Sequence, residues 1–237
     1  MIQPNMFTGF SKETVRFYQD LTRNNETGWF LQNKEIYTHA VVEPAKAFIL
    51  SMGEKLTLLS PDIVADTRTN GAGSLFRIYR DVRFSKDKSP YKTYLGIYFW
   101  EGSGKKLENP GFYFHLDADQ SLLMLGAGQY IFHKSALEVF RNAVIDEKKG
   151  PALNQAMQET LSRGDYEFGG KHYKRIPRGF DDQHPNSEFL LYNGLWASYQ
   201  CIIPDLFYCS DLIEFCFEKY RDMDPVQRWL VQVLGSH

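Results

Sequence analysis

The first sixty residues place hydrophobic side chains at helical spacing. In the segment KETVRFYQDLTRN after Ser11, the residues Val15, Phe17, Tyr18 and Leu21 repeat at roughly helical spacing, and a serine in front of such a pattern is a favourable N-cap. We expect Asn24 or Asn25 to end this helix and to cap a second one. Pro44 should then break or restart the helix, because proline suits a first turn but not an interior. A third helix, AKAFILSMGEKLTLLS, is predicted to stop before Pro61.

From about residue 62 the hydrophobic pattern changes to alternation. Leu75–Phe84 alternates between two faces, and Arg80 falls on the face that is otherwise apolar. Further strands are predicted at Tyr91–Trp100, Gly111–Leu116 and Ser121–Gly126. Because short turns join them, we expect antiparallel pairing; a parallel pair needs a crossover of a dozen or more residues.

Helical spacing returns after residue 133. The pattern predicts helices at Ala136–Lys148 and Pro151–Arg163, one more strand at Leu195–Ile203, and two closing helices around Ser210–Arg221 and Pro225–Leu234. Residues 1–61 are thus expected to be helical, 62–130 to form the strand block, and 131–237 to be mostly helical. This order predicts a single α+β domain over residues 1–237, with an antiparallel sheet in the middle of the chain packed by N-terminal and C-terminal helices.

Composition is ordinary for a globular protein, apart from an aromatic share of 15%. A total charge of −2 argues against a general nucleic-acid coat, so any contact with an anion must be local. Cys201, Cys209 and Cys216 form no CxxC pair and are expected to be small buried side chains in a reducing compartment. No apolar run approaches the ~18 residues of a membrane helix, and no secretory signal is recognisable, so we expect a cytoplasmic protein without a membrane partner.

One segment departs from this charge balance. Leu75–Thr93 contains six basic and two acidic residues, which leaves a local charge of +4. The basic residues are Arg77, Arg80, Arg83, Lys86, Lys88 and Lys92, and the acidic residues are Asp81 and Asp87. Arginine donates two parallel hydrogen bonds to phosphate or carboxylate, lysine adds compact charge, and Tyr91 offers a hydroxyl or a flat ring. The segment therefore predicts a site for a phosphorylated or otherwise anionic small molecule, with the two aspartates as acid/base or orienting groups.

Two other interpretations of these charges stay open. The charges could pair with one another and only hold the strand block to the N-terminal helices. Against complete pairing, a guanidinium on an apolar face, as predicted for Arg80, needs either a carboxylate or a ligand. Alternatively, the same strand and its tyrosines could form a non-enzymatic module for nucleic acid or an acidic protein, with binding that falls steeply as salt rises.

A second basic run follows later in the chain. This run, Lys171–Arg178, would complete a cleft if it folded beside the first, and its candidate binding residues are Lys174, Arg175 and Arg178. Asp181, Asp182 and His184 come next and could bind a divalent metal or act as acid/base groups, but spacing alone is weak support, and no cofactor is predicted.

Other chemistry-bearing positions are less informative. His115 and Asp117 should share one face of a strand, where such a pair is more often a hydrogen bond than a metal site. The chain has no P-loop, HExxH, GxSxG or EF-hand motif, so these motifs indicate no particular reaction. The sequence also predicts no oligomeric state.

Four segments together carry a family resemblance. They are NNETGWF at Asn24–Phe30, RIYRDVRFSKDKSPYKT at Arg77–Thr93, PGFYFHLD at Pro110–Asp117 and KRIPRGFDDQHP at Lys174–Pro185. In this order, over nearly the whole chain, they resemble the domain-of-unknown-function family 2461. That family usually has arginine and an acidic residue before its Trp-Phe pair, where this chain has Thr27 and Gly28. The resemblance implies a single-domain α+β fold and no established activity.

Overall fold

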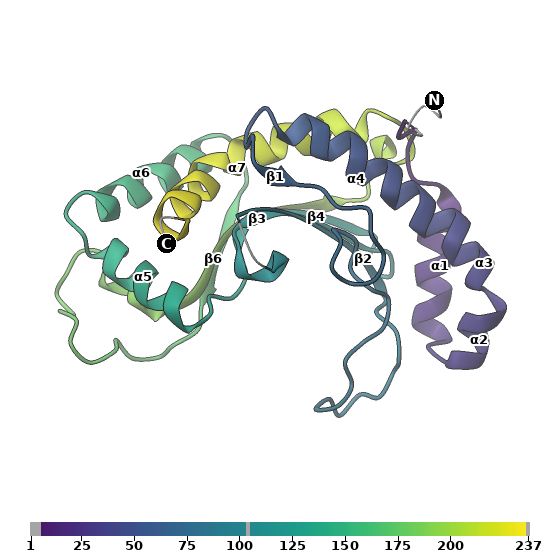
Figure 1. Cartoon of the computed structure of the whole chain (residues 1–237), viewed down its shortest axis with the longest axis horizontal. Helices are drawn as coiled ribbons and strands as arrows, with labels where there is room; N and C mark the ends of the chain where they lie inside the picture. The colour runs from purple at the N-terminus through teal and green to yellow at the C-terminus, as the bar shows by residue number, and fades with distance from the viewer. Residues whose placement is uncertain (1–5, 103–104, 236–237) are drawn as a thin grey trace. The chain divides into compact units, whose positions relative to one another are not determined.

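The computed structural model describes residues 6–102 and 105–235. Within them the strands form a six-stranded antiparallel sheet in the order β1-β2-β3-β4-β6-β5 (Figure 1). The strands are β1 (Ile63–Val64), β2 (Tyr94–Glu101), β3 (Gly111–Asp117), β4 (Leu122–Gln129), β5 (Glu167–Lys171) and β6 (Tyr192–Ile202). The predicted α+β class, with the sheet in the middle of the chain and helices at both ends, is confirmed.

Helices precede and follow the sheet. The α-helices are α1 (Lys12–Arg23), α2 (Thr27–Gln32), α3 (Lys34–Ile36), α4 (Glu43–Leu56), α5 (Lys134–Val144), α6 (Lys149–Ser162) and α7 (Leu212–Leu234). A π-helical turn, η1 (Tyr37–Val42), leads into α4, and short 3-10 turns are η2 (Lys106–Glu108), η3 (Ser187–Leu191) and η4 (Asp205–Tyr208). Pro44 lies in the first turn of α4, at the restart that the sequence predicts.

The chain divides into two compact units. Unit 1 takes in residues up to Phe99 together with Tyr113–Leu125 and Gln200–Phe217. Unit 2 takes in Trp100–Phe112, Gly126–Tyr199 and the chain from Glu218 onward. Strands β2, β3, β4 and β6 and helix α7 each contribute residues to both units.

Two features of unit 1 are an N-cap at the start of α1 and aromatic packing between α4 and β3. Ser11 caps α1 as predicted: its Oγ accepts a hydrogen bond from the Thr14 backbone N–H, and the Thr14 hydroxyl in turn accepts from the Ser11 backbone N–H. Phe48 of α4 is fully buried against Phe114 of β3, with ring centroids 4.7 Å apart. Because side chains alternate along a strand, the neighbours of Phe114 point to the opposite face of β3, which carries His115.

The predicted strand at Leu75–Phe84 is wrong. Only two isolated bridges form there, Leu75 with Ile97 and Tyr79 with Tyr91. Beyond Arg80 the charged side chains bond to nearby backbone groups, and such local bonds compete with a strand ladder. Phe84, expected on the apolar face, is 95% exposed.

Two further predictions for helices and strands need correction. Asn25 does not cap α2, whose N-cap position is Glu26; the Asn25 side chain bonds elsewhere. The C-terminal part contains β5 in addition to the one strand that was predicted. The strand could not be predicted from its sequence, EFGGK, because the two glycines interrupt the alternation of apolar and polar residues. Gly169 is needed at its position, since a Cβ atom there would stand 2.2 Å from the Trp196 ring.

The predicted pair of closing helices is instead one continuous helix, α7, with Pro225 inside it. A proline in a helix interior removes the hydrogen bond to the carbonyl four residues earlier, here that of Arg221. Arg163 replaces that donor, since its Nη1 lies 2.9 Å from the Arg221 carbonyl oxygen. The side chain of Arg163 also pairs with Glu159.

We expect Arg163→Ala to lower the free energy of unfolding by about 1–2 kcal/mol, because the Arg221 carbonyl then loses its charged donor. Urea unfolding measures this. Glu159→Gln is the matched control, because it removes the ion pair of Arg163 and keeps the donor to Arg221; we expect a loss of only about 0–0.5 kcal/mol. Equal losses in the two variants would contradict the role given to the Arg221 contact.

Candidate functional site

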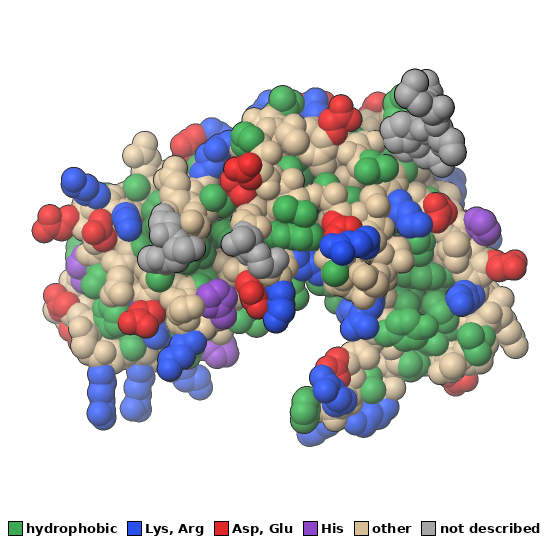
Figure 2. Space-filling model, in the orientation of Figure 1, with side chains coloured by type: hydrophobic (Ala, Val, Ile, Leu, Met, Phe, Trp, Pro, Cys, Tyr) green, Lys and Arg blue, Asp and Glu red, His purple; other side chains and the backbone are tan. Residues whose placement is uncertain are grey.

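The predicted basic segment lies in the long connection between β1 and β2. In Figure 1 this connection extends away from the sheet, and Figure 2 shows Lys, Arg, Asp and Glu side chains gathered along it. All of it belongs to unit 1. The segment is therefore a projecting, charged loop, and its polar contacts decide what it presents to solvent.

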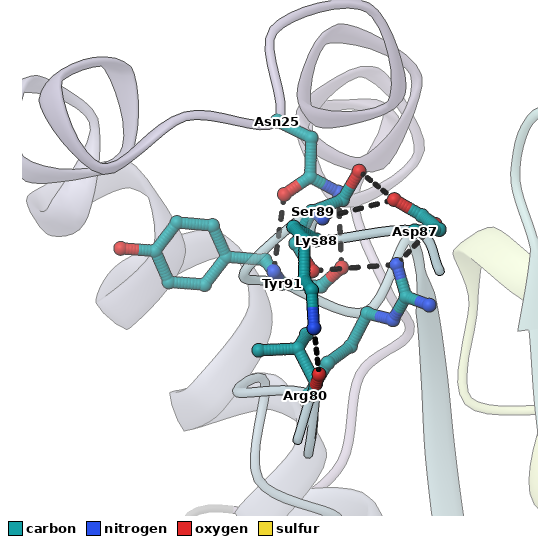
Figure 3. Close-up of polar contacts among 7 residues, drawn as sticks. Asn25, Arg80, Asp87, Lys88, Ser89 and Tyr91 are labelled. Atoms are coloured by element: carbon teal, nitrogen blue, oxygen red, sulfur yellow. Dashed lines mark hydrogen bonds and ion pairs between the residues drawn. The ribbon is translucent and has the colours of Figure 1, made fainter. Parts of the chain in front are cut away.

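Each aspartate of the loop is bound to an arginine. The Nε and Nη2 atoms of Arg83 donate to the Asp81 carboxylate at 2.9 and 2.7 Å. Arg80 pairs with Asp87, which also accepts the Ser89 hydroxyl at 2.6 Å (Figure 3). The partner that Arg80 was expected to need is thus a carboxylate of the same loop.

These bonds keep both aspartates ionised. The hydrogen bonds from the Arg83 side chain and backbone lower the pKa of Asp81 to about 2. The Ser89 hydroxyl, the Ser89 backbone N–H and Arg80 together lower the pKa of Asp87. Of the two roles predicted for these carboxylates, the orienting role suits this geometry better, because groups ionised throughout the neutral range donate protons poorly.

A side-chain amide joins the end of the loop to the first helices. Asn25, between α1 and α2, donates from Nδ2 to the Tyr91 carbonyl at 2.9 Å and accepts the Tyr91 N–H at Oδ1 at 3.0 Å (Figure 3). The Tyr91 ring stacks on Phe30 with centroids 4.3 Å apart and is 3% exposed. Tyr91, a predicted anion-binding residue, is therefore fixed on both its backbone and its ring.

A groove of about 600 Å³ opens beside this junction. Its lining residues are Thr22, Asn25, Arg80, Asp81, Asp87, Ser89, Tyr91, Lys92, Thr93 and Tyr94. Of the residues predicted for the site, it brings together Arg80, Lys92, Tyr91 and both aspartates. Thr22, Asn25, Ser89, Thr93 and Tyr94 were not predicted.

Lys92 is half-buried in this groove without a carboxylate partner. Its Nζ donates to the Arg77 carbonyl oxygen at 2.7 Å and lies 5.7 Å from the centre of the Phe76 ring. Burial, together with the nearby Arg77 guanidinium, lowers the pKa of Lys92. Among the described residues, neither Lys92 nor Arg77 has a carboxylate oxygen within 4.0 Å.

The other predicted cations lie outside the groove lining. Lys88 donates from Nζ to the Val82 carbonyl at 2.9 Å (Figure 3). Lys86 is exposed on the same loop. Lys174, Arg175 and Arg178 belong to unit 2 and the first basic run to unit 1, so a site formed by both runs stays a prediction.

Asp181, Asp182 and His184, which follow the second basic run, accept hydrogen bonds from residues close to them in the chain. Asp181 accepts the Gln183 backbone N–H at 2.9 Å, and His184 accepts the Asn186 N–H through Nδ1 at 3.1 Å. No group of three or more His, Cys, Asp or Glu side chains in the described part of the chain could hold a metal ion.

The fold and the groove define an α+β protein in which Lys92 and Arg77 of unit 1 form no ion pair with a carboxylate of the described residues. The chain belongs to the family described as Conserved hypothetical protein (DUF2461), whose model matches residues 13–229. No curated protein and no solved structure matches. None of the helices in residues 6–102 and 105–235 has the length and apolar character needed to cross a membrane.

Proposed function

We propose that unit 1 binds an anionic small molecule, such as a phosphorylated compound, in the groove beside Lys92. The observation that carries the proposal is the half-buried ammonium of Lys92, which has a second cation, Arg77, as its electrostatic neighbour and no carboxylate partner among the described residues. Partly burying a charge without an opposite charge costs free energy, and a bound anion would offset that cost.

The distribution of charge in the groove supports the proposal. Asp81 and Asp87 line the groove, but each already has its own guanidinium, from Arg83 and Arg80. Their negative charges are therefore largely neutralised by these pairs. An anion near Lys92 would meet a net positive site, and an oxyanion suits the combination of an ammonium and a guanidinium.

Sulfate and inorganic phosphate are suitable probes. We expect either anion to raise the Tm of the wild-type protein more than chloride does at equal ionic strength. With a Kd of about 1 mM, 20 mM anion would stabilise the protein by about 1.8 kcal/mol, an increase in Tm of about 4–7 °C. Because sulfate stabilises most proteins weakly by exclusion, the same salts are also applied to Arg77→Gln, which should lose the specific part of the increase. An equal increase in both proteins would refute the proposal.

A second candidate, a binding module for nucleic acid or an acidic protein, draws on one observation. Phe84 is 95% exposed beside the Arg83 guanidinium, which lies 5.8 Å from its ring centre, on a loop that also carries Lys86 and Lys88. An exposed ring among cations suits base stacking and phosphate contacts. Salt-sensitive retention on single-stranded DNA that Phe84→Ser removes would favour this candidate over the small-molecule site.

A further inference from the structure

Unit 1 also contains a histidine that the proposed site does not yet include. His115 of β3 is half-buried, and its Nδ1 lies 2.9 Å from the Tyr113 hydroxyl. The ring of Tyr94 packs on the imidazole, with centroids 4.7 Å apart. Since Tyr113 occupies Nδ1, Nε2 is the nitrogen that remains for a ligand, and no described residue is bonded to it.

Two chains of contacts connect His115 to the groove beside Lys92. In the first, Tyr94 lines the groove together with Lys92 and packs on the imidazole. In the second, the Phe76 ring meets the Tyr113 ring edge to face at 5.9 Å, and the Lys92 ammonium lies 5.7 Å from the Phe76 ring centre. The imidazole is therefore connected to the ammonium through the Tyr94 ring in the first chain of contacts and through the Phe76 and Tyr113 rings in the second.

A glycine makes room for this arrangement. At Gly96 of β2, a Cβ atom would stand 2.9 Å from the Tyr113 hydroxyl and 3.0 Å from the Phe76 ring. A side chain at that position would displace the hydroxyl that holds His115 and the ring that supports Lys92. The absence of a side chain at Gly96 thus serves both residues at once.

The groups around His115 together favour its neutral form. Burial lowers the pKa of His115, and Asp117 on the same strand partly offsets that effect. Tyr94 of β2 and Tyr113 of β3 face the imidazole, and Tyr18 of α1 interacts with both tyrosines. The three tyrosines are neutral at physiological pH, so an anion bound nearby would be the main new influence on the imidazole and would favour its charged form.

We propose that His115, which is outside the groove lining, takes up a proton from solvent when the anion binds beside Lys92, so that the imidazolium adds a second positive charge to the site across the Tyr94 ring. The inference rests on the proposed function and narrows the ligand class. Two cationic groups at one anion suit a group with two negative charges, such as a phosphate monoester, better than a monocarboxylate.

Sulfate is the probe, because it carries no proton near pH 7 and any proton taken up must come to the protein. We expect calorimetric titrations in two buffers of different ionisation enthalpy to report uptake of a fraction of one proton per sulfate at pH 7. Binding should be about three- to sixfold tighter at pH 6 than at pH 8, since a shift of one pKa unit gives its full tenfold effect only below both pKa values. In His115→Gln both the proton uptake and the pH dependence should disappear, whereas His39→Gln, an exposed histidine of unit 1, should match the wild type.

An NMR titration of the His115 Cε1 proton in the wild type gives a second measurement that needs no variant: its pKa should rise when sulfate is present. Sulfate binding without proton uptake, or equal pH dependence in His115→Gln, would overturn this inference and leave the anion site standing. Absence of sulfate and phosphate binding in the wild type would overturn both proposals together.

Discussion

Lys92→Met is expected to abolish the specific stabilisation by sulfate while leaving the unliganded protein about as stable as the wild type. The ammonium of Lys92 is half-buried beside Arg77 and has no carboxylate partner among the described residues. Methionine keeps the length and the apolar contact with Phe76 and removes the charge. We expect a change of no more than about 1 kcal/mol without sulfate, because the lost hydrogen bond to the Arg77 carbonyl offsets the removal of a half-buried charge, and we expect the loss of nearly all specific sulfate stabilisation.

The difference in unfolding free energy between the wild type and Lys92→Met should depend on pH with a definite sign. The pKa of Lys92 is lower in the folded protein than its ordinary value of 10.5, so the unfolded chain binds more protons in the interval between the two values. The wild type should therefore gain stability relative to Lys92→Met as the pH rises through that interval. Lys86→Met is the matched control: Lys86 is exposed on the same loop and outside the groove, and its replacement should leave sulfate binding unchanged. Loss of binding in both variants would indicate a diffuse charge effect.

Asn25→Asp is expected to lower the free energy of unfolding by about 2–3 kcal/mol at pH 7. The replacement keeps the acceptor for the Tyr91 N–H but removes the donor to the Tyr91 carbonyl oxygen, and it places a negative charge against that oxygen. Because Tyr91 directly precedes Lys92, we also expect weaker sulfate binding.

The neighbouring asparagine supplies the control for this change. Asn24 is exposed and donates only to the Asp20 carbonyl, so Asn24→Asp should cost less than about 1 kcal/mol. The deficit of Asn25→Asp should shrink as the pH falls towards 4, because the introduced carboxyl group regains a donor when it is protonated. Urea unfolding at pH 4.5 and pH 7 measures both effects, and a deficit that does not depend on pH would contradict the donor role.

The fold class was predictable because it depends on local periodicity. Ser11 and the apolar positions after it indicate α1 without any distant contact, and the alternation in β2–β4 does the same for the sheet. The prediction fails where side chains bind the backbone, as beyond Arg80, or where a distant residue compensates, as Arg163 does for Pro225. Neither kind of contact leaves a periodic signal.

The candidate site was predictable only in part, for a similar reason. Counting charges indicated that cations would remain after every aspartate was paired. The count could not show that Asp81 pairs with Arg83 and Asp87 with Arg80. Asn25 lies 66 positions from Tyr91, so spacing could not reveal their contact. Asn25 itself was interpreted only as a helix end or cap, and its segment, NNETGWF, as part of the family resemblance.

The contact between Asn25 and Tyr91 has a consequence for self-association. Tyr91 forms an isolated bridge with Tyr79 in which the hydrogen bonds run from Arg80 to Pro90 and from Lys92 to Ile78, so the N–H and C=O groups of Tyr91 point away from that partner. The Asn25 carboxamide forms hydrogen bonds with both the N–H and the C=O of Tyr91, as the backbone of an added strand would. Unoccupied, they would offer a template for β-augmentation by another chain. A single asparagine thus occupies the two backbone groups through which another chain would pair with Tyr91.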